Sequence, residues 1–239
     1  MPHTIRDKVI QSLIDQKEIF GDELFDTGIF KTENITKVAE SKSDYTGEDW
    51  TNADSLEELN SLICECQNCI LGSSRNKFVF GSGNANADVM VIGEGPGAEE
   101  DIQGLPFVGR AGQLLTDILK AIHFERDEVY IANIVKCRPP ANRTPSPAEM
   151  DACIPYLKRQ IELIKPKVIL CLGLTAAQGL LKRKDSLGNL RGKIFDYSGV
   201  KVMVTFHPAA LLRNPNWKRD CWEDVKKFRK LYEQSQEVG

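Results

Sequence analysis

The chain has 239 residues with a formal net charge of −3, and 41% of its residues are hydrophobic. This length suits one α/β domain with a full core and some additional sequence. There is no apolar run of about 18 residues and no basic-then-apolar start, which argues against a membrane-spanning helix and a secretory signal peptide. We therefore expect a soluble, cytoplasmic protein without a membrane partner.

The negative charge is concentrated near the N-terminus. Residues 1–53 contain 11 acidic and 6 basic residues, whereas residues 54–239 contain 23 acidic and 25 basic residues and carry a charge of +2. Because +2 is small for a nucleic-acid-binding surface, DNA binding would depend on local basic clusters. The two candidate clusters are Lys136, Arg138 and Arg143, and Arg213, Lys218 and Arg219. Ordinary solvated surface is the alternative for either cluster.

Residues 1–53 are expected to form an N-terminal extension. The aliphatic residues between positions 4 and 20 are spaced for one stripe of an amphipathic helix. From about residue 26 the sequence is polar and loses its periodicity, which predicts a linker. The predicted organisation is therefore a helix and a linker over residues 1–53, followed by one domain over residues 54–239.

The predicted domain alternates strands and helices. Asp54 and Glu57 resemble a capping box that opens a helix running through Ile63. Later strands are expected from short apolar runs, and later helices from amphipathic periodicity. In chain order, they are a strand at 87–94, a helix at 111–122, a strand at 128–136, a helix at 147–165, a strand at 167–173, a helix at 175–182, a strand at 200–206 and a helix at 216–234. This alternation predicts an α/β fold with a parallel sheet covered by helices on both faces.

Three candidate site segments follow or end predicted strands. They are the loop GEGPG at Gly93–Gly97, Asn133, and His207. Ligands of parallel α/β sheets bind outside the carboxyl ends of the strands. We therefore expect these three segments to meet at one edge of the sheet.

The GEGPG loop is a poor match to a dinucleotide-binding motif. Its glycine spacing differs from GxGxxG, it contains a proline, and no helix is expected to open directly after it. No nucleotide cofactor is therefore expected. Gly93, Gly95 and Gly97 would instead let the backbone approach a flat ligand closely. A tight turn without a ligand is the alternative.

Asn133 and Phe107 are candidates for holding that ligand. A side-chain amide at the end of an apolar strand is costly to bury unless it has partners. An amide can donate to O4 of uracil and accept from its N3 hydrogen, whereas cytosine presents the opposite order. Phe107, in the loop GLPFVGRAG, could stack on the same ring. The alternatives are a satisfied core amide for Asn133 and a core plug for Phe107.

His207 lies between a predicted strand and the segment PAALLRNP. A histidine before a proline at a strand end is more often functional than one within a helix. Leu211 and Leu212 precede Arg213, an order that resembles an apolar wedge beside a phosphate clamp. A buried helix start is the alternative for the two leucines.

Four of the seven cysteines suggest a metal site. Cys66 and Cys69 have CxxC spacing, and Cys137 and Cys153 can supply two further ligands. In a reducing compartment a metal site is favoured over disulfides. A site closed by four sulfurs has no open position for substrate, so a structural role is expected. The spacing alone leaves zinc and iron–sulfur open. Cys64 is read as a spare thiol, and Cys171 and Cys221 as small buried apolar residues.

Several motifs together resemble the family 4 uracil-DNA glycosylases, the iron–sulfur type. They are the segments GEGPGAEEDIQGLPFVGRAGQLL, NIVKCRPPANRTP and HPAALLRNP and the four cysteines, and they span about residues 60 to 232. The resemblance implies a three-layer α/β/α sandwich with a central four-stranded parallel sheet, and a monomer acting on uracil-containing DNA. It also implies a 4Fe–4S cluster on Cys66, Cys69, Cys137 and Cys153, in preference to zinc. The implied uracil pocket consists of Gly93, Glu94, Gly95, Phe107, Asn133 and His207.

The resemblance also exposes a gap in the chemistry. In other branches of the superfamily an Asp or Asn in this loop handles the attacking water, but this chain has Gly95 there. Glu94 and Glu100 are the nearest carboxylates in sequence and are provisional catalytic candidates beside His207. Glu100 resembles a family position near the C5 edge of uracil. The competing hypotheses are a non-catalytic DNA-binding module and a redox protein that uses the cluster for electron transfer.

Overall fold

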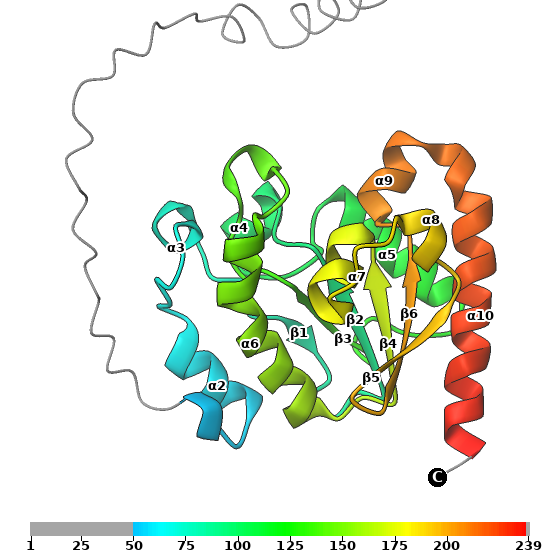
Figure 1. Cartoon of the computed structure of the whole chain (residues 1–239), viewed down its shortest axis with the longest axis horizontal. Helices are drawn as coiled ribbons and strands as arrows, with labels where there is room; N and C mark the ends of the chain where they lie inside the picture. Colours follow the sequence, from blue (N-terminus) through cyan, green and yellow to red (C-terminus); the bar gives the residue numbers. More distant parts are fainter. Residues whose placement is uncertain (1–49, 238–239) are drawn as a thin grey trace, which may run out of the picture. The chain divides into compact units, whose positions relative to one another are not determined.

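A computed structural model describes residues 50–237, so the helix expected at 4–20 and most of the expected linker lie outside the described residues. The described elements are η2 (Trp50–Asn52), α2 (Leu56–Ile63), α3 (Leu71–Ser74), β1 (Ser82–Gly83), β2 (Val89–Gly93), α4 (Ala98–Gln103), α5 (Arg110–Ala121), β3 (Tyr130–Asn133), η3 (Pro140–Asn142), α6 (Pro147–Ile164), β4 (Val168–Leu172), α7 (Leu174–Leu181), α8 (Leu187–Leu190), β5 (Ile194–Tyr197), β6 (Val200–Thr205), α9 (Pro208–Arg213), η4 (Pro215–Trp217) and α10 (Lys218–Glu237) (Figure 1). None of the helices in this part of the chain is long and apolar enough to cross a membrane.

The sheet has six strands in the order β1-β3-β2-β4-β6-β5. The four central strands are parallel, which confirms the predicted four-stranded parallel sheet. β1 and β5 add an antiparallel edge on each side and were not predicted. β1 has only two residues, and β5 alternates between exposed and half-buried positions, so neither forms an apolar run.

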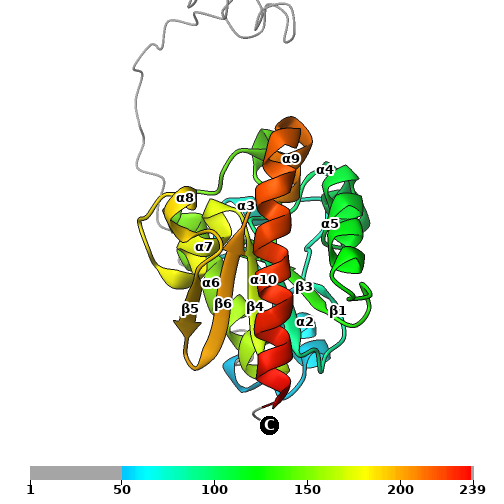
Figure 2. The ribbon, with the colours of Figure 1, turned by 90° about the vertical axis from the view of Figure 1, so that its right-hand side faces the viewer.

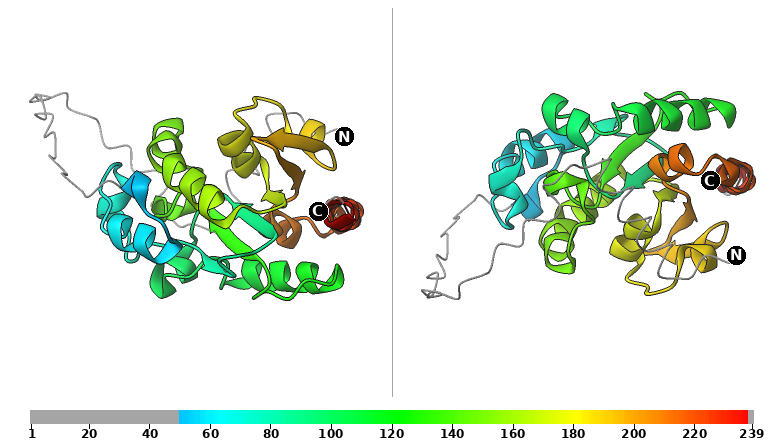
Figure 3. Two further views of the ribbon diagram at one scale, coloured as in Figure 1. Left: turned by 90° about the horizontal axis from the view of Figure 1, so that it is seen from below. Right: turned by 90° about the horizontal axis from the view of Figure 1, so that it is seen from above.

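Helices cover both faces of the sheet, because alternate strand residues point to opposite sides. Met90 and Ile92 belong to a core shared with α2, α6 and α7. Val89 and Val91 belong to a second core shared with α5, α9 and α10. Figure 2 shows α10 lying along the strands, and Figure 3 shows helices on both sides of the sheet. The predicted three-layer α/β/α class is confirmed.

Capping residues fix where the helices begin. Ser146 accepts from the Glu149 amide, and the Glu149 carboxylate accepts from the Ser146 amide, which forms a capping box at the start of α6. The cap of α2 was placed one residue too early. Ser55, not Asp54, is its N-cap and accepts from the Glu58 amide.

The compact body already includes residues just before Asp54. Trp50 packs edge-on against Tyr156, with ring centroids 4.9 Å apart, and Ala53 is buried. Residues 50–53, which the prediction assigned to the N-terminal extension, therefore include side chains that pack with the domain.

Candidate active site

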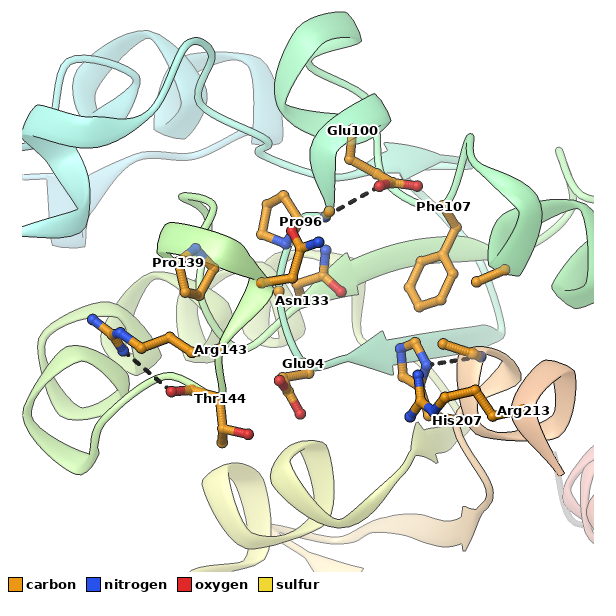
Figure 4. Close-up of a pocket in the computed structure, with 15 residues that line it drawn as sticks. Glu94, Pro96, Glu100, Phe107, Asn133, Pro139, Arg143, Thr144, His207 and Arg213 are labelled. Atoms are coloured by element: carbon orange, nitrogen blue, oxygen red, sulfur yellow. Dashed lines mark hydrogen bonds between the residues drawn. The ribbon is translucent and has the colours of Figure 1, made fainter. Parts of the chain in front are cut away.

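A pocket of about 410 Å³ opens at the carboxyl ends of the parallel strands (Figure 4). Gly93 and Asn133 are paired neighbours at the ends of β2 and β3, and His207 follows β6 by two residues. Strand pairing therefore brings together the three segments expected at this edge. The lining residues are Glu94, Gly95, Pro96, Gly97, Glu100, Phe107, Ala111, Asn133, Pro139, Asn142, Arg143, Thr144, His207, Ala209 and Arg213.

The glycines of the GEGPG loop make room for protein neighbours. A Cβ on Gly93 would lie 2.5 Å from Asn133 Oδ1 and 2.6 Å from Phe107 Cζ, and a Cβ on Gly95 would lie 2.6 Å from Val135 Cγ2. The glycines would therefore help a flat ligand only indirectly, by making room for the side chains that contact it. The bare backbone lets Asn133 and Phe107 reach the pocket.

A helix does open directly after the loop, contrary to the sequence expectation. α4 begins at Ala98, and it ends at Gly104, which has a left-handed φ of 78°. The helix has only six residues, three of them acidic in its first turn, so it shows no apolar periodicity.

Glu100 joins two loops of the pocket. Its Oε2 accepts from the Gly97 amide at 3.1 Å. Its Oε1 accepts from the Val108 and Gly109 amides, each at 2.9 Å. Because both oxygens are engaged by backbone donors, the geometry favours a positioning role over proton transfer. Glu94 also lines the pocket and is half-buried.

Phe107 lies at the pocket wall in a conformation that its neighbours impose. It is 6% exposed, and its φ of 53° lies in the left-handed region, which is uncommon for a residue with a bulky side chain. A Cβ at Gly112 in α5 would overlap the Phe107 carbonyl group, so the close packing of this loop on α5 requires glycine there. The ring is therefore held in one orientation beside His207.

Asn133 is 1% exposed, and its Oδ1 has no hydrogen-bond partner among the described residues. An unsatisfied buried acceptor typically costs about 1–3 kcal/mol. Figure 4 shows the Asn133 side chain between Glu94 and Phe107 in the pocket. The alternative of a core amide satisfied by the protein is therefore wrong for this oxygen.

His207 is the N-cap of α9, and its Nδ1 accepts from the Ala209 amide at 3.2 Å. Burial, and to a smaller extent the Arg213 charge, lower the pKa of His207 to about 4, while Glu100 acts in the opposite direction. The imidazole is therefore neutral at neutral pH. With Nδ1 as acceptor, Nε2 carries the hydrogen and can donate to a ligand.

The two leucines of α9 face in different directions. Leu211 is 1% exposed and belongs to the core on the α5 and α10 side of the sheet, whereas Leu212 is 37% exposed. The expected DNA contact is therefore wrong for Leu211, because a one-turn helix packed on α5 must bury one side. Arg213 lines the pocket beside His207, as its predicted role as a phosphate clamp requires.

The opposite wall of the pocket was not predicted as part of the site, although Arg143 belongs to one of the two candidate basic clusters. It consists of Pro139, Asn142, Arg143 and Thr144 around η3 (Figure 4). Arg143 is held by Glu149, with nitrogen–oxygen distances of 2.6 and 2.8 Å. The sequence clue was the position of RPPANRTP shortly after Asn133, since segments that follow a strand end reach the same edge of the sheet.

The four candidate metal-ligating cysteines come from three segments. Cys66 and Cys69 follow α2, Cys137 follows β3, and Cys153 lies in α6. Burial raises the pKa of Cys137 to about 11 and of Cys153 to about 12, and both thiols also respond to the charge of Cys66. Within residues 50–237, no three His, Cys, Asp or Glu side chains form a ready-made group for one metal ion.

Hydrogen-bond donors surround these sulfurs. Arg75 donates to Cys137 Sγ at 3.3 Å and to the carbonyl of Cys66. Tyr156 Oη donates to Cys66 Sγ at 3.2 Å, and the Lys136 amide donates to Cys153 Sγ at 3.3 Å. Donors of this kind stabilise thiolates and the sulfurs of iron–sulfur clusters. The donor set therefore fits an anionic sulfur site.

Three other residues named from the sequence lie outside the pocket. Lys136 is fully buried, so it belongs to no DNA-binding surface, and burial lowers its pKa to about 8. Cys171 and Cys221 are buried in the two cores, as expected. Lys136 was misplaced because it stands among charged and polar neighbours in NIVKCR, where nothing in the local sequence distinguishes a buried lysine from a surface one.

Comparisons with known proteins identify the family of this chain. The Uracil DNA glycosylase superfamily profile matches residues 80–226. The chain is 44% identical over 181 residues to a type-4 uracil-DNA glycosylase of Pyrobaculum aerophilum, covering 72% of this chain and 92% of that protein. It is 41% identical over 186 residues to the type-4 enzyme of Archaeoglobus fulgidus, and 44% identical over 182 residues to that of Thermotoga maritima. Each of these alignments covers 74% of this chain and at least 94% of the relative. The chain therefore belongs to the uracil DNA glycosylase superfamily.

Proposed function

We propose that this chain is a DNA repair glycosylase that takes deoxyuridine out of the DNA stack and hydrolyses its N-glycosidic bond. The products are free uracil and an abasic site. The observation that carries this proposal is the buried, unpartnered Oδ1 of Asn133 in a pocket bounded by Phe107 and His207. The relatives from Pyrobaculum aerophilum and Archaeoglobus fulgidus, which are named type-4 uracil-DNA glycosylases, also support it.

Asn133 selects the base. Its free Oδ1 accepts from the N3 hydrogen of uracil, and its amide nitrogen donates to O4. Cytosine presents an acceptor at N3 and a donor at its exocyclic amine, so it would meet like groups. Phe107 stacks on one face of the base, and this stacking is worth about 1–3 kcal/mol. Together these contacts offset part of the cost of flipping the nucleotide.

His207 stabilises the leaving base. Cleavage of the N-glycosidic bond places negative charge on uracil, chiefly at O2, and positive charge on the sugar. A neutral His207 with Nε2–H as donor can hydrogen-bond to O2 without carrying a charge of its own. Such a donor acts most strongly where charge develops in a buried site.

Water then attacks C1′ of the sugar. This step needs only a weak base because the sugar cation is already electrophilic. Glu94 is the provisional base, since it lines the pocket and no hydrogen bond to another described side chain occupies its carboxylate. Glu100 is engaged with three backbone amides and is proposed to shape the pocket for the base.

DNA is proposed to bind across the rim of the pocket. Leu212 is the exposed apolar side chain that would enter the base step, and Arg213 would contact a phosphate next to the flipped nucleotide. Because the substrate is DNA, the proposed place of action is the compartment that contains it. The protein is proposed to act there as a monomer, as the resemblance to the family 4 glycosylases implies.

The four cysteines are proposed to hold a 4Fe–4S cluster in preference to zinc. The donors at Cys66, Cys137 and Cys153 support an anionic sulfur site, and the resemblance to the family 4 glycosylases implies iron–sulfur. When bound, the cluster would cross-link the loop after α2 to the end of β3 and to α6. That cross-link would support the segment that carries Pro139 to Thr144 at the pocket.

The activity is tested with single-stranded oligonucleotides that contain one uracil, thymine or hypoxanthine, followed by alkaline cleavage. We expect strand cleavage and free uracil from the uracil oligonucleotide and none from the thymine control. A non-catalytic DNA-binding module would retain the oligonucleotide without releasing a base. That result would refute the proposed function.

A further inference from the structure

Lys136 is a fully buried lysine without a carboxylate partner. It is 0% exposed, and its ammonium nitrogen donates to Gln160 Oε1 at 2.5 Å. Among the residues that the structure describes, no carboxylate forms an ion pair with it. The Gln160 amide is itself engaged with the carbonyl of Phe80 and the hydroxyl of Tyr130. The buried cation therefore has a neutral partner only.

A buried charge without a counter-ion is costly, and proteins normally pair such a group or neutralise it. Lys136 cannot contact DNA, because its side chain is completely buried. The remaining question is which anion balances the charge.

The candidate anions are the thiolates beside Lys136. Its own amide donates to Cys153 Sγ at 3.3 Å, and Cys137 is the next residue in the chain. Cys153 and Gln160 are seven residues apart in α6, which is about two helical turns and the same face. Lys136 therefore lies along one face of α6, with its backbone at a sulfur and its side chain directed to Gln160.

We propose that Lys136 is the buried counter-ion of the iron–sulfur cluster. Four thiolates outweigh the positive charge of a 4Fe–4S core, so the assembled site carries a net negative charge. The inference rests on the cluster proposed above and adds a residue that is not a ligand. Arg75 also donates to Cys137 Sγ, but it is only partly buried and two backbone carbonyls satisfy it, so its charge is less dependent on the cluster.

The test is a comparison of loaded and metal-free protein. Wild type, Lys136→Met and Lys158→Met are each purified anaerobically, assayed for iron and sulfide, and melted with the cluster and after removal of iron by a chelator. Lys158 lies in the same helix but is exposed, so it is the matched control. We expect Lys136→Met to lower the melting temperature of the loaded protein and to raise that of the metal-free protein. Lys158→Met should leave both unchanged.

A second readout is the rate at which a chelator removes the cluster, followed by its visible absorbance. Loss of a buried counter-ion should speed removal by about tenfold, which lies in the range of measured couplings between groups of one hydrogen-bond or charge network. Lys136→Gln serves if Lys136→Met does not fold. A Lys136 variant that folds but does not retain iron also supports the proposal.

Equal changes in the loaded and metal-free melting temperatures, with unchanged cluster loss, would overturn the counter-ion role. If wild-type protein contains iron but the Lys136 substitution affects loaded and metal-free protein equally, the counter-ion role is rejected and the cluster proposal still stands. Wild-type protein without iron or sulfide would remove both the cluster and its counter-ion. None of these readouts depends on uracil release, so the glycosylase proposal is judged separately.

Discussion

The rings of Phe107 and His207 lie 5.5 Å apart, centroid to centroid, at an interplanar angle of 30°. Aromatic rings in contact typically lie about 4.5–7 Å apart, so no third ring fits between these two. A bound base must therefore lie on one face of Phe107 with an edge toward His207. This arrangement separates the two roles, since Phe107 contributes stacking and His207 contributes a hydrogen bond.

Replacement of His207 by alanine should slow uracil release from a single-stranded oligonucleotide by about 10²–10³-fold, because one donor to the developing charge is lost. His207→Gln, which keeps an N–H donor, should retain more activity than His207→Ala. Single-turnover rates measure the chemical step directly. Wild-type rates in His207→Ala would show that the imidazole has no such role.

The same histidine should make folding sensitive to acid. Its pKa is lowered from 6.5 to about 4, chiefly by burial. Between these pH values the histidine is therefore protonated in the unfolded chain and neutral in the folded protein. As the pH is lowered from 6.5 to about 4, the free energy of unfolding therefore decreases. Below about pH 4 the histidine makes no further change to it. The melting temperature of wild type should drop more than that of His207→Gln between these pH values. Parallel pH curves for the two proteins would contradict the buried, neutral imidazole.

Asn133→Leu should separate stability from activity. The two side chains have similar shape, and the substitution removes an unsatisfied buried acceptor that costs about 1–3 kcal/mol. We expect an unchanged or higher melting temperature together with loss of uracil release. A large drop in melting temperature would mean that Oδ1 has a protein partner in solution.

The carboxylates of Glu94 and Glu100 should respond differently to conversion to glutamine. Glu100→Gln places an N–H opposite the Gly97 amide, so it should lower the melting temperature and the rate while the pH–rate profile keeps its shape. Glu94→Gln should lower the rate by about 10²-fold and flatten the acidic limb of the profile, as loss of a general base does. If Glu100→Gln flattens that limb and Glu94→Gln does not, the two roles are reversed.

Substitution of single cysteines should identify the cluster ligands. Cys66→Ser should lose iron and the broad visible absorbance, because Cys66 lies among the sulfurs near Cys137 and Cys153. Cys64→Ser is the matched control, since Cys64 is two residues away and its Sγ is directed to the Ser61 carbonyl. Loss of iron in both variants would place the ligand pair in a different register.

The sequence determined the parallel sheet, the edge at which the site lies and most of the pocket. Buried strands produce apolar runs, and residues that follow such strands share one end of the sheet whatever the details of packing. Gly93, Asn133 and His207 could therefore be grouped before any contact was known; Asn133 and His207 line the pocket, and Gly93 pairs with Asn133. The CxxC spacing and the two later cysteines were visible for the same reason, because ligand type and spacing are local properties.

Tertiary structure decided which way individual side chains face. Leu211 and Leu212 are adjacent and chemically identical, yet only packing against α5 buries the first and exposes the second. Lys136 resembles a surface lysine in the local sequence, but α6 covers it and buries it completely. Burial and hydrogen bonding depend on segments far apart in the chain, so no local pattern encodes them.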